Sequence, residues 1–135
     1  MTDRNTMTIS FPGGLKVAAD FQGHHLVTDQ PKEDGGDGSG PEPFVLFLAS
    51  IGACAGYYVL KFCSARDLPM EGVGVTQRMI RDPETNKLEK IALDIEVPAS
   101  FPEKYRGALL RAASQCAVKK AIERPVPIET QTVVV

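Results

Sequence analysis

Three cysteines are the residues of this 135-residue chain that could do chemistry beyond packing. Cys54 and Cys63 lie in one apolar stretch, and Cys116 lies in a later segment. The number of cysteines is odd, and no two of them have CxxC spacing. The sequence therefore indicates neither a disulfide framework nor a zinc site. Residues 1–10 lack the charged-then-apolar pattern of a secretory signal, and we therefore expect a cytoplasmic protein with reduced thiols.

Cys54 lies between Gly52 and Gly56 in the apolar stretch. Glycines four residues apart remove the side chains from one face of a helix, so that another backbone could approach that face closely. Glycine inside a helix costs about 1 kcal/mol relative to alanine, which favours a packing reason for the pair. Two interpretations of Cys54 stay open at this point, a small buried hydrophobe or a reactive thiol.

The other two cysteines differ in what they can reach. Cys63 lies nine residues after Cys54, half a helical turn out of phase, so the two cannot bridge within one straight helix, and Cys63 is predicted to pack. Cys116 is followed by Lys119 and Lys120, which favour a thiolate, although the nearby helix C-terminus opposes one. A two-thiol site of Cys54 and Cys116 is geometrically possible, but spacing alone does not establish it.

Other motifs give no cofactor or metal site. The glycine-rich segment 35–40 fits neither a dinucleotide fingerprint, nor a P-loop, nor an EF-hand loop. His24 and His25 are adjacent on a predicted strand and face opposite ways, and the chain has no third histidine. No GxSxG context supports a serine triad.

The first half of the chain must position Cys54. Residues 7–28 alternate like short strands, with turns at 13–14 and 22–23. Residues 30–41 are rich in glycine and are predicted to form a mobile surface loop. Pro43 then suits the first turn of a long helix that we expect to extend to about Arg66.

The second half must position Cys116. Residues 73–81 and 88–97 show a two-residue period that predicts a hairpin. Residues 102–123 have apolar spacings of three and four that predict a second helix, ended by Pro125 and Pro127. The side chains of residues 128–135 show a two-residue alternation that predicts a last strand. This order predicts an α+β fold and a single domain over residues 1–135.

Composition limits the partners. The net charge is −2, from 15 basic and 17 acidic residues, which argues against nucleic acid. Residues 44–60 carry no charge and reach the lower length of a membrane span, about 17 residues. The run is rich in Gly, Ala and Ser and is the only one of its kind in the sequence, so we expect a helix buried in a protein core rather than a membrane partner.

Three segments resemble one known family. They are SGPEP at 39–43, LASIGAC at 48–54, and CAV at 116–118 on the later helix. Together they resemble the OsmC/Ohr family, which contains the osmotically inducible protein C and the organic hydroperoxide resistance proteins. The resemblance covers nearly the whole chain, including the order of its elements.

The resemblance implies a fold and an activity. The fold would be an intertwined homodimer, with antiparallel sheets around a long buried central helix. The activity would be that of a thiol peroxidase acting on organic hydroperoxides, with Cys54 as the peroxidatic and Cys116 as the resolving cysteine. Cys54 would form a sulfenic acid and then a disulfide with Cys116, and a dithiol reductant, of the lipoyl type in some members, would restore both.

The chain also departs from the family pattern. Val45 stands where the family carries a glutamate, and the early strands contain no arginine after Arg4, so that Lys16 is the nearest cation. Without this pair, burial is expected to raise the pKa of the Cys54 thiol, unless Arg78 or Arg81 supplies a cation. The alternative function is therefore an OsmC-like dimer that senses redox state or binds a small ligand, with little or no turnover.

Overall fold

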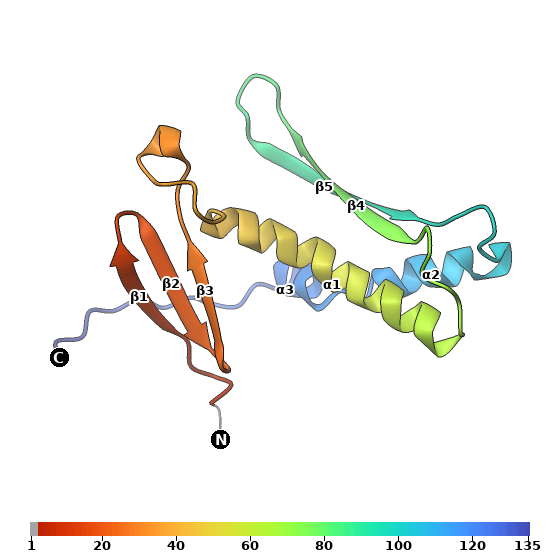
Figure 1. Cartoon of the computed structure of the whole chain (residues 1–135), viewed down its shortest axis with the longest axis horizontal. Helices are drawn as coiled ribbons and strands as arrows, with labels where there is room; N and C mark the ends of the chain where they lie inside the picture. Colours follow the sequence, from red (N-terminus) through yellow and green to blue (C-terminus); the bar gives the residue numbers. More distant parts are fainter. Residues whose placement is uncertain (1–2) are drawn as a thin grey trace. The chain divides into compact units, whose positions relative to one another are not determined.

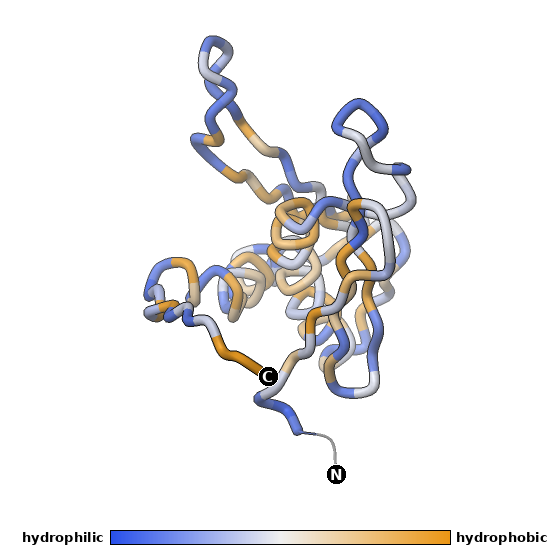
Figure 2. Tube along the Cα trace, turned by 90° about the vertical axis from the view of Figure 1, so that its left-hand side faces the viewer, coloured by the Kyte–Doolittle hydropathy of each residue, from blue (hydrophilic) through white to orange (hydrophobic). Residues whose placement is uncertain are grey.

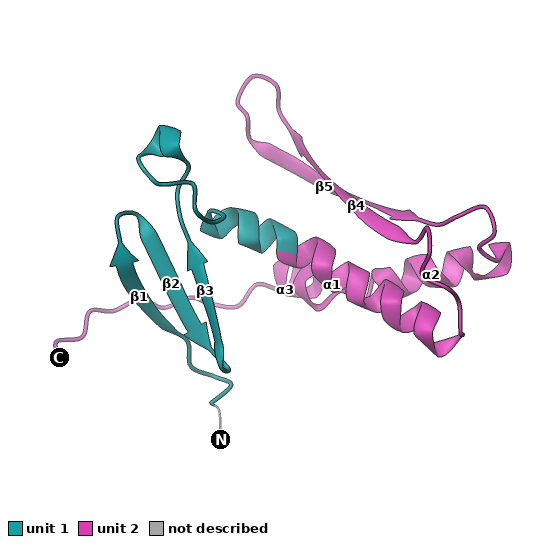
Figure 3. Cartoon of the chain, in the orientation of Figure 1, with its two compact units in different colours: residues 1–49 teal, residues 50–135 magenta. Residues whose placement is uncertain are grey.

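The computed structural model describes residues 3–135 and has the predicted α+β composition of helices and antiparallel strands. The chain forms two compact units, residues 1–49 and 50–135 (Figure 3). Helix α1 (Pro43–Ala65) begins in the first unit and ends in the second, and matches the predicted long helix. Each unit is described by itself below.

The first unit contains a three-stranded antiparallel sheet in the order β1-β2-β3 (Figure 1). The strands are β1 (Thr8–Gly13), β2 (Lys16–Phe21) and β3 (His24–Thr28). Gly14, Gln22 and Gly23 adopt positive φ angles of 57°, 48° and 78° in the two tight turns. The short strands and both turns predicted for residues 7–28 are confirmed.

The loop after β3 is organised around one buried carboxylate, that of Asp29, which is 0% exposed. Its Oδ1 accepts a hydrogen bond from the Gln30 N–H at 2.8 Å. Its Oδ2 accepts from the Asp37 N–H at 3.2 Å, the Ser39 N–H at 3.1 Å and the Ser39 hydroxyl at 2.6 Å. The prediction of a mobile loop missed this anchor, because glycine content reports backbone freedom and not the acceptor that the backbone folds around.

The same loop also requires a close backbone approach. A Cβ atom on Gly36 would lie 2.0 Å from the carbonyl oxygen of Gln30, so only glycine fits there. The loop includes a short 3₁₀ helix, η1 (Lys32–Asp34). Hydrogen bonds from the Ser39 hydroxyl and N–H outweigh the effect of burial and lower the pKa of Asp29 to about 2.

The second unit contains the predicted hairpin, formed by β4 (Gly74–Arg81) and β5 (Leu88–Glu96). Cross-strand pairs such as Val75 with Ile95 place apolar side chains on one face of the hairpin. The buried core of this unit comprises Val59, Phe62, Cys63, Phe101, Leu109 and Ala113. Cys63 is 0% exposed, and burial raises the pKa of its thiol, so the prediction that it packs is confirmed.

The predicted helix over residues 102–123 is wrong as one continuous element. The structure has η2 (Glu103–Tyr105), α2 (Arg106–Ala113) and α3 (Ala117–Glu123), with a break at residues 114–116. Apolar spacing does not detect such a break, because the pattern continues across it. This break positions Cys116, as described below.

The predicted strand over residues 128–135 is also wrong. Residues 125–135 have no regular secondary structure, and Ile128 and Val134 are 90% and 94% exposed. Figure 2 shows the hydrophobic colouring of this C-terminal segment. A strand needs a neighbouring backbone to accept its hydrogen bonds, and among the described residues this segment pairs with none.

The glycine pair on α1 does not face another backbone within the chain. A Cβ atom on Gly52 would lie 2.6 Å from Oε1 of Gln77 on β4, whereas Gly56 has open space within 4 Å. The predicted packing reason for glycine holds at Gly52, but the group that approaches is the Gln77 side chain rather than a backbone.

Helix α1 is only partly covered by its own chain. It is long and apolar enough to cross a membrane by length and composition, and 22% of its most apolar window is buried. Its large exposed apolar side chains are Phe44, Val45, Phe47, Tyr57 and Leu60, between 40% and 56% exposed. A single chain therefore does not supply the buried environment predicted for this helix.

We predict that a second copy of the chain covers α1 in an obligate homodimer that buries more than roughly 2,000 Å². Light scattering at micromolar concentration should give twice the chain mass of 14.6 kDa. A folded monomer under these conditions would refute the prediction. Solubility that depended on detergent would instead indicate that lipid covers the helix.

A second prediction concerns Asp29. Because its pKa is about 2, below the ordinary value of 3.8, it stabilises the fold above about pH 4, and this stabilisation disappears as the pH falls towards 2. Asp29→Asn should lower the Tm at pH 7 by about 5 °C, and the deficit should shrink on acidification. Asp34→Asn, an exposed carboxylate in the same loop, is the matched control. Equal Tm values for the two variants would contradict the anchoring role.

Candidate thiol site

The site begins with the helix break at residues 114–116. The Ser114 hydroxyl donates to the Leu110 carbonyl oxygen at 2.9 Å as α2 ends. Cys116 then adopts φ −49° and ψ 119°, outside the helical region, and becomes the N-cap of α3. Its Sγ accepts a hydrogen bond from the Lys119 N–H at 3.4 Å. A sulfur thus takes the place that a Ser or Asp oxygen usually fills at a helix start.

The break turns Cys116 towards α1. Cys116 is 1% exposed, and its S–H lies 3.8 Å from the Ile51 carbonyl oxygen, to which it can donate. Cys54 follows Ile51 by three residues and therefore lies on the same face of α1. The neighbouring Cys116 thiol is one of the groups that lower the pKa of Cys54. The structure thus brings together the two cysteines that were proposed as a pair and leaves Cys63 in the core.

The pKa of Cys54 is lowered, contrary to the rise expected from the sequence. The main cause is a hydrogen bond from the Val118 N–H, which outweighs the opposing effect of burial. The Cys116 S–H and the Ala117 N–H lower the pKa further. The expectation was wrong because it considered only charged side chains as partners, whereas the first amides of α3 also stabilise a thiolate.

The pKa of Cys116 is raised, chiefly by burial. The Lys119 N–H opposes this rise, and the hydrogen bond to Cys54 adds to it. The two lysine side chains do not favour a Cys116 thiolate as predicted, because the Lys119 Nζ lies 4.0 Å from Glu123 and the Lys120 Nζ bonds to Gln115 at 2.9 Å. Cys54 is thus the more acidic thiol of the pair and Cys116 the less acidic.

The charged groups that were considered as activators lie elsewhere. Arg78 forms an ion pair with Asp94 at 3.0 Å, and Arg81 donates to the Asn86 carbonyl oxygen at 3.2 Å. Val45 is nine residues before Cys54, half a turn out of phase along α1.

The Ala117 and Val118 amides are the donors that sequence reasoning missed. The polar pair Ser114-Gln115 before Cys116 was the one local signal for a helix restart.

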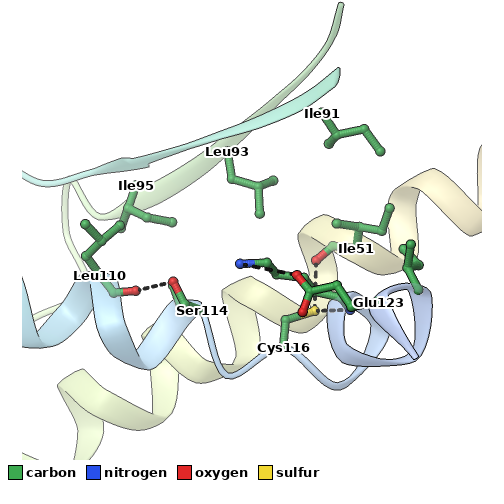
Figure 4. Close-up of a pocket in the computed structure, with 11 residues that line it drawn as sticks. Ile51, Ile91, Leu93, Ile95, Leu110, Ser114, Cys116 and Glu123 are labelled. Atoms are coloured by element: carbon green, nitrogen blue, oxygen red, sulfur yellow. Dashed lines mark hydrogen bonds and ion pairs between the residues drawn. The ribbon is translucent and has the colours of Figure 1, made fainter. Parts of the chain in front are cut away.

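A mostly apolar pocket of about 330 Å³ adjoins Cys116 (Figure 4). Side chains of β5 point towards it from one side, and α1, α2 and α3 supply the others. This volume lies at the small end of the range for ligand pockets. The lining residues are Ile51, Ile91, Leu93, Ile95, Leu110, Ala113, Ser114, Cys116, Lys119, Ile122 and Glu123.

The chemistry available here is that of thiols. Among residues 3–135, no group of three His, Cys, Asp or Glu side chains is placed to hold a metal ion. Of the two thiols, Cys116 lines the apolar pocket and Cys54 does not. A pair of unequally acidic thiols can attack an electrophilic atom of a small molecule and then close a disulfide.

We predict that the lowered pKa makes Cys54 the most reactive thiol near neutral pH. Iodoacetamide should alkylate Cys54 with a pH midpoint below the ordinary cysteine value, because only the thiolate reacts. Cys116→Ala removes the S–H donor and should move this midpoint upward, whereas Cys63→Ala should leave it unchanged. A Cys54 midpoint at or above the ordinary value would show that the α3 amides do not stabilise its thiolate.

One family model matches most of the chain. Residues 36–131 match the family model described as OsmC-like protein. No curated protein sequence matches the chain.

Solved structures share the fold at low sequence identity. A Psychrobacter arcticus 273-4 protein, described as an osmotic stress induced and detoxification response protein, has a TM-score of 0.69 at 16% identity over 90% of each chain. An organic hydroperoxide resistance protein OsmC from Legionella pneumophila has a TM-score of 0.53 at 21% identity, covering 87% of this chain and 88% of its own. The organic hydroperoxide resistance protein OhrB of Bacillus subtilis has a TM-score of 0.50 at 17% identity, covering 89% and 92%.

The structural similarity establishes the fold. The sequence identities are too low to establish the reaction, which must be inferred from the site. The family match extends over more than half of the chain and includes both cysteines of the pair. The chain therefore belongs to the OsmC-like protein family, as a divergent member.

Proposed function

We propose that the protein is a cysteine-based thiol peroxidase that reduces organic hydroperoxides, with Cys54 peroxidatic and Cys116 resolving. The observation that supports it is the pair itself: a Cys54 thiol of lowered pKa near a buried Cys116 thiol of raised pKa. The apolar pocket beside Cys116 favours an alkyl or aryl hydroperoxide over hydrogen peroxide. Family membership supports a role in oxidative stress defence.

In the first step the Cys54 thiolate attacks the terminal oxygen of the hydroperoxide. The O–O bond breaks, an S–O bond forms, and the alkoxide leaves and takes a proton to become an alcohol. Cys54 is oxidised to a sulfenic acid. The Val118 and Ala117 amides assist because they lower the pKa of the attacking thiol.

In the second step the Cys116 sulfur attacks the Cys54 sulfenic acid. The S–O bond breaks, a disulfide forms, and the Cys116 proton leaves with the hydroxide as water. The raised pKa of Cys116 keeps this proton on the thiol until the step occurs. A dithiol reductant of the lipoyl type then returns both cysteines to thiols and is itself oxidised to a disulfide.

The setting we propose is a cytoplasmic homodimer, because that compartment keeps both thiols reduced between turnovers. We also propose that residues 1–135 act as one OsmC-like domain, since the family match spans both compact units. Neither nucleic acid nor a membrane is part of the proposal.

One observation favours the second candidate function, a redox sensor or small-ligand binder. Cys116 is 1% exposed, which leaves a reductant little access to a disulfide at that sulfur. Slow reduction would turn the same chemistry into a lasting oxidised state. The number of turnovers with a dithiol separates a sensor from a peroxidase.

The proposed function predicts a specific pattern of activities. The wild-type chain should consume cumene hydroperoxide over many turnovers with dihydrolipoamide, and hydrogen peroxide more slowly. Cys54→Ser should lower the rate at least about 100-fold, since nucleophile loss removes the covalent path. Cys116→Ser should still be oxidised at Cys54 but should form no intramolecular disulfide.

Cys63→Ser is the matched control and should retain the wild-type rate. A single turnover by the wild-type chain would favour the sensor. A wild-type rate in Cys54→Ser, or Cys63 in the main disulfide, would refute the assignment.

A further inference from the structure

We propose that a strip of exposed basic side chains along residues 104–124 is a docking surface for an acidic protein that carries the dithiol reductant. The inference rests on the proposed function for the need of a reductant, and it adds the kind of molecule that presents the dithiol. The basic strip consists of Lys104, Arg106, Arg111, Lys119, Lys120 and Arg124, all of them exposed.

Charge is unevenly distributed along the chain. Residues 101–124 contain six of the 15 basic residues and only two of the 17 acidic ones. This stretch therefore carries a charge of +4, although the whole chain carries −2. A local excess of one sign attracts partners of the opposite sign and raises the rate of their association, by a factor of about 10 to 1,000 in favourable cases. The net charge of the chain hides this basic region.

Several of these charges are unfavourable for the helices that carry them. Arg106 is the first residue of α2, and Lys119 lies in the first turn of α3. Neither helix has an acidic residue in its first turn, where negative charge is favourable because the free N–H groups carry partial positive charge. Lys120 and Arg124 are four residues apart, a spacing at which like charges repel. Helix stability accounts for Arg111 and Lys120, which lie in last turns, but not for the strip as a whole.

Among residues 3–135, only one cation of the basic strip has a carboxylate partner. The Lys119 Nζ lies 4.0 Å from Glu123, and this pair is exposed. The Lys120 Nζ bonds to the neutral Gln115 side chain at 2.9 Å. The other four cations form no ion pair with a described residue. The strip thus presents positive charge that the chain itself does not neutralise.

The start of the basic strip shows the same pattern around one aromatic ring. The Lys104 Nζ lies 5.0 Å from the centre of the Tyr105 ring, and the guanidinium carbon of Arg66 on α1 lies 5.8 Å from the same centre. Neither cation is paired with a carboxylate of the described chain. Two positive charges therefore converge here and are available to a carboxylate of a partner.

The basic strip flanks the sulfur whose disulfide must be reduced. Cys116 lies between Arg111 and Lys119 in the sequence, and the Lys119 side chain lines the same pocket as Cys116 (Figure 4). Because Cys116 is 1% exposed, a free dithiol has little access to it. A dithiol on a docked partner is present at a high effective concentration and has many more attempts to reach the disulfide.

The chemistry of the site selects a protein among the possible anionic partners. Nucleic acid and anionic lipid are also attracted to basic side chains, but neither carries a dithiol. A protein with acidic side chains around a dithiol supplies both the charge and the reductant. In the reaction its two thiols become a disulfide, and the Cys54–Cys116 disulfide becomes two thiols.

Two synthetic dithiol peptides test the inference on the full chain. Both have a Cys-Gly-Pro-Cys centre, which is flanked by four glutamates in one peptide and by four glutamines in the other. The Cys54–Cys116 disulfide is formed with diamide, which needs no hydroperoxide, and its reduction is timed by mass spectrometry. At about 10 mM salt the glutamate peptide should react about tenfold faster than the glutamine peptide. At about 1 M salt the two rates should converge, because the screening length falls to about 3 Å.

Variants locate the effect on the chain. Arg106→Gln with Arg111→Gln should slow the glutamate peptide about fivefold, the factor expected from two exposed ion pairs. The glutamine peptide should react as with the wild type. Lys87→Gln with Lys90→Gln is the matched control, since it removes two exposed positive charges outside the basic strip. Equal slowing in this control, or equal rates of the two peptides at low salt, would overturn the inference.

A binding measurement makes the test independent of the disulfide. Peptides with serine in place of both cysteines are added to the reduced protein, and amide chemical shifts are recorded by NMR. The glutamate version should shift amides within residues 104–124, and the glutamine version should not. Absence of these shifts, or tighter binding of a DNA duplex or of anionic lipid vesicles to the strip, would overturn the inference. If the glutamate peptide binds and reduces as expected but the hydroperoxide forms no disulfide, the proposed function fails and the inference stands.

Discussion

The thiol site depends on where the first three amides of α3 find their acceptors. Residues 114–116 leave the helical path, and a new helix starts at Cys116, whose own sulfur caps it. The amides of Ala117 and Val118 are then directed to Cys54. One break in the backbone therefore places Cys116 at the start of α3 and gives its sulfur a backbone donor.

The same geometry gives the two thiols different properties without any charged side chain. Cys54 receives backbone and thiol donors, which lower its pKa, while burial dominates at Cys116 and raises its pKa. A carboxylate at position 45 and an arginine on an early strand are thus not the only means of stabilising a thiolate in this fold. Backbone amides do so with no ion pair to desolvate. This accounts for a divergent OsmC-like chain that keeps the cysteines and lacks the charged pair.

Apolar surface is left exposed in several parts of the chain. Tyr57 and Leu60 on α1, together with Ile128 and Val134 near the C-terminus, are each half or more exposed. By contrast, the buried Asp29 carboxylate accepts four hydrogen bonds from its own loop. Hydrogen bonds of a loop can be satisfied locally, whereas covering a long apolar helix takes a large complementary surface. This contrast is the physical argument for assembly.

Local period and turn chemistry were enough to predict the three early strands, α1, the hairpin and the packing of Cys63. The pairing of Cys54 with Cys116 followed from family resemblance, and the structure brings the two sulfurs together. Four features could not be predicted from residue types: the break before α3, the loss of the last strand, the anchor at Asp29 and the direction of the Cys54 pKa. Each of these depends on a backbone donor or acceptor, and backbone groups are the same at every position, so residue types do not reveal them.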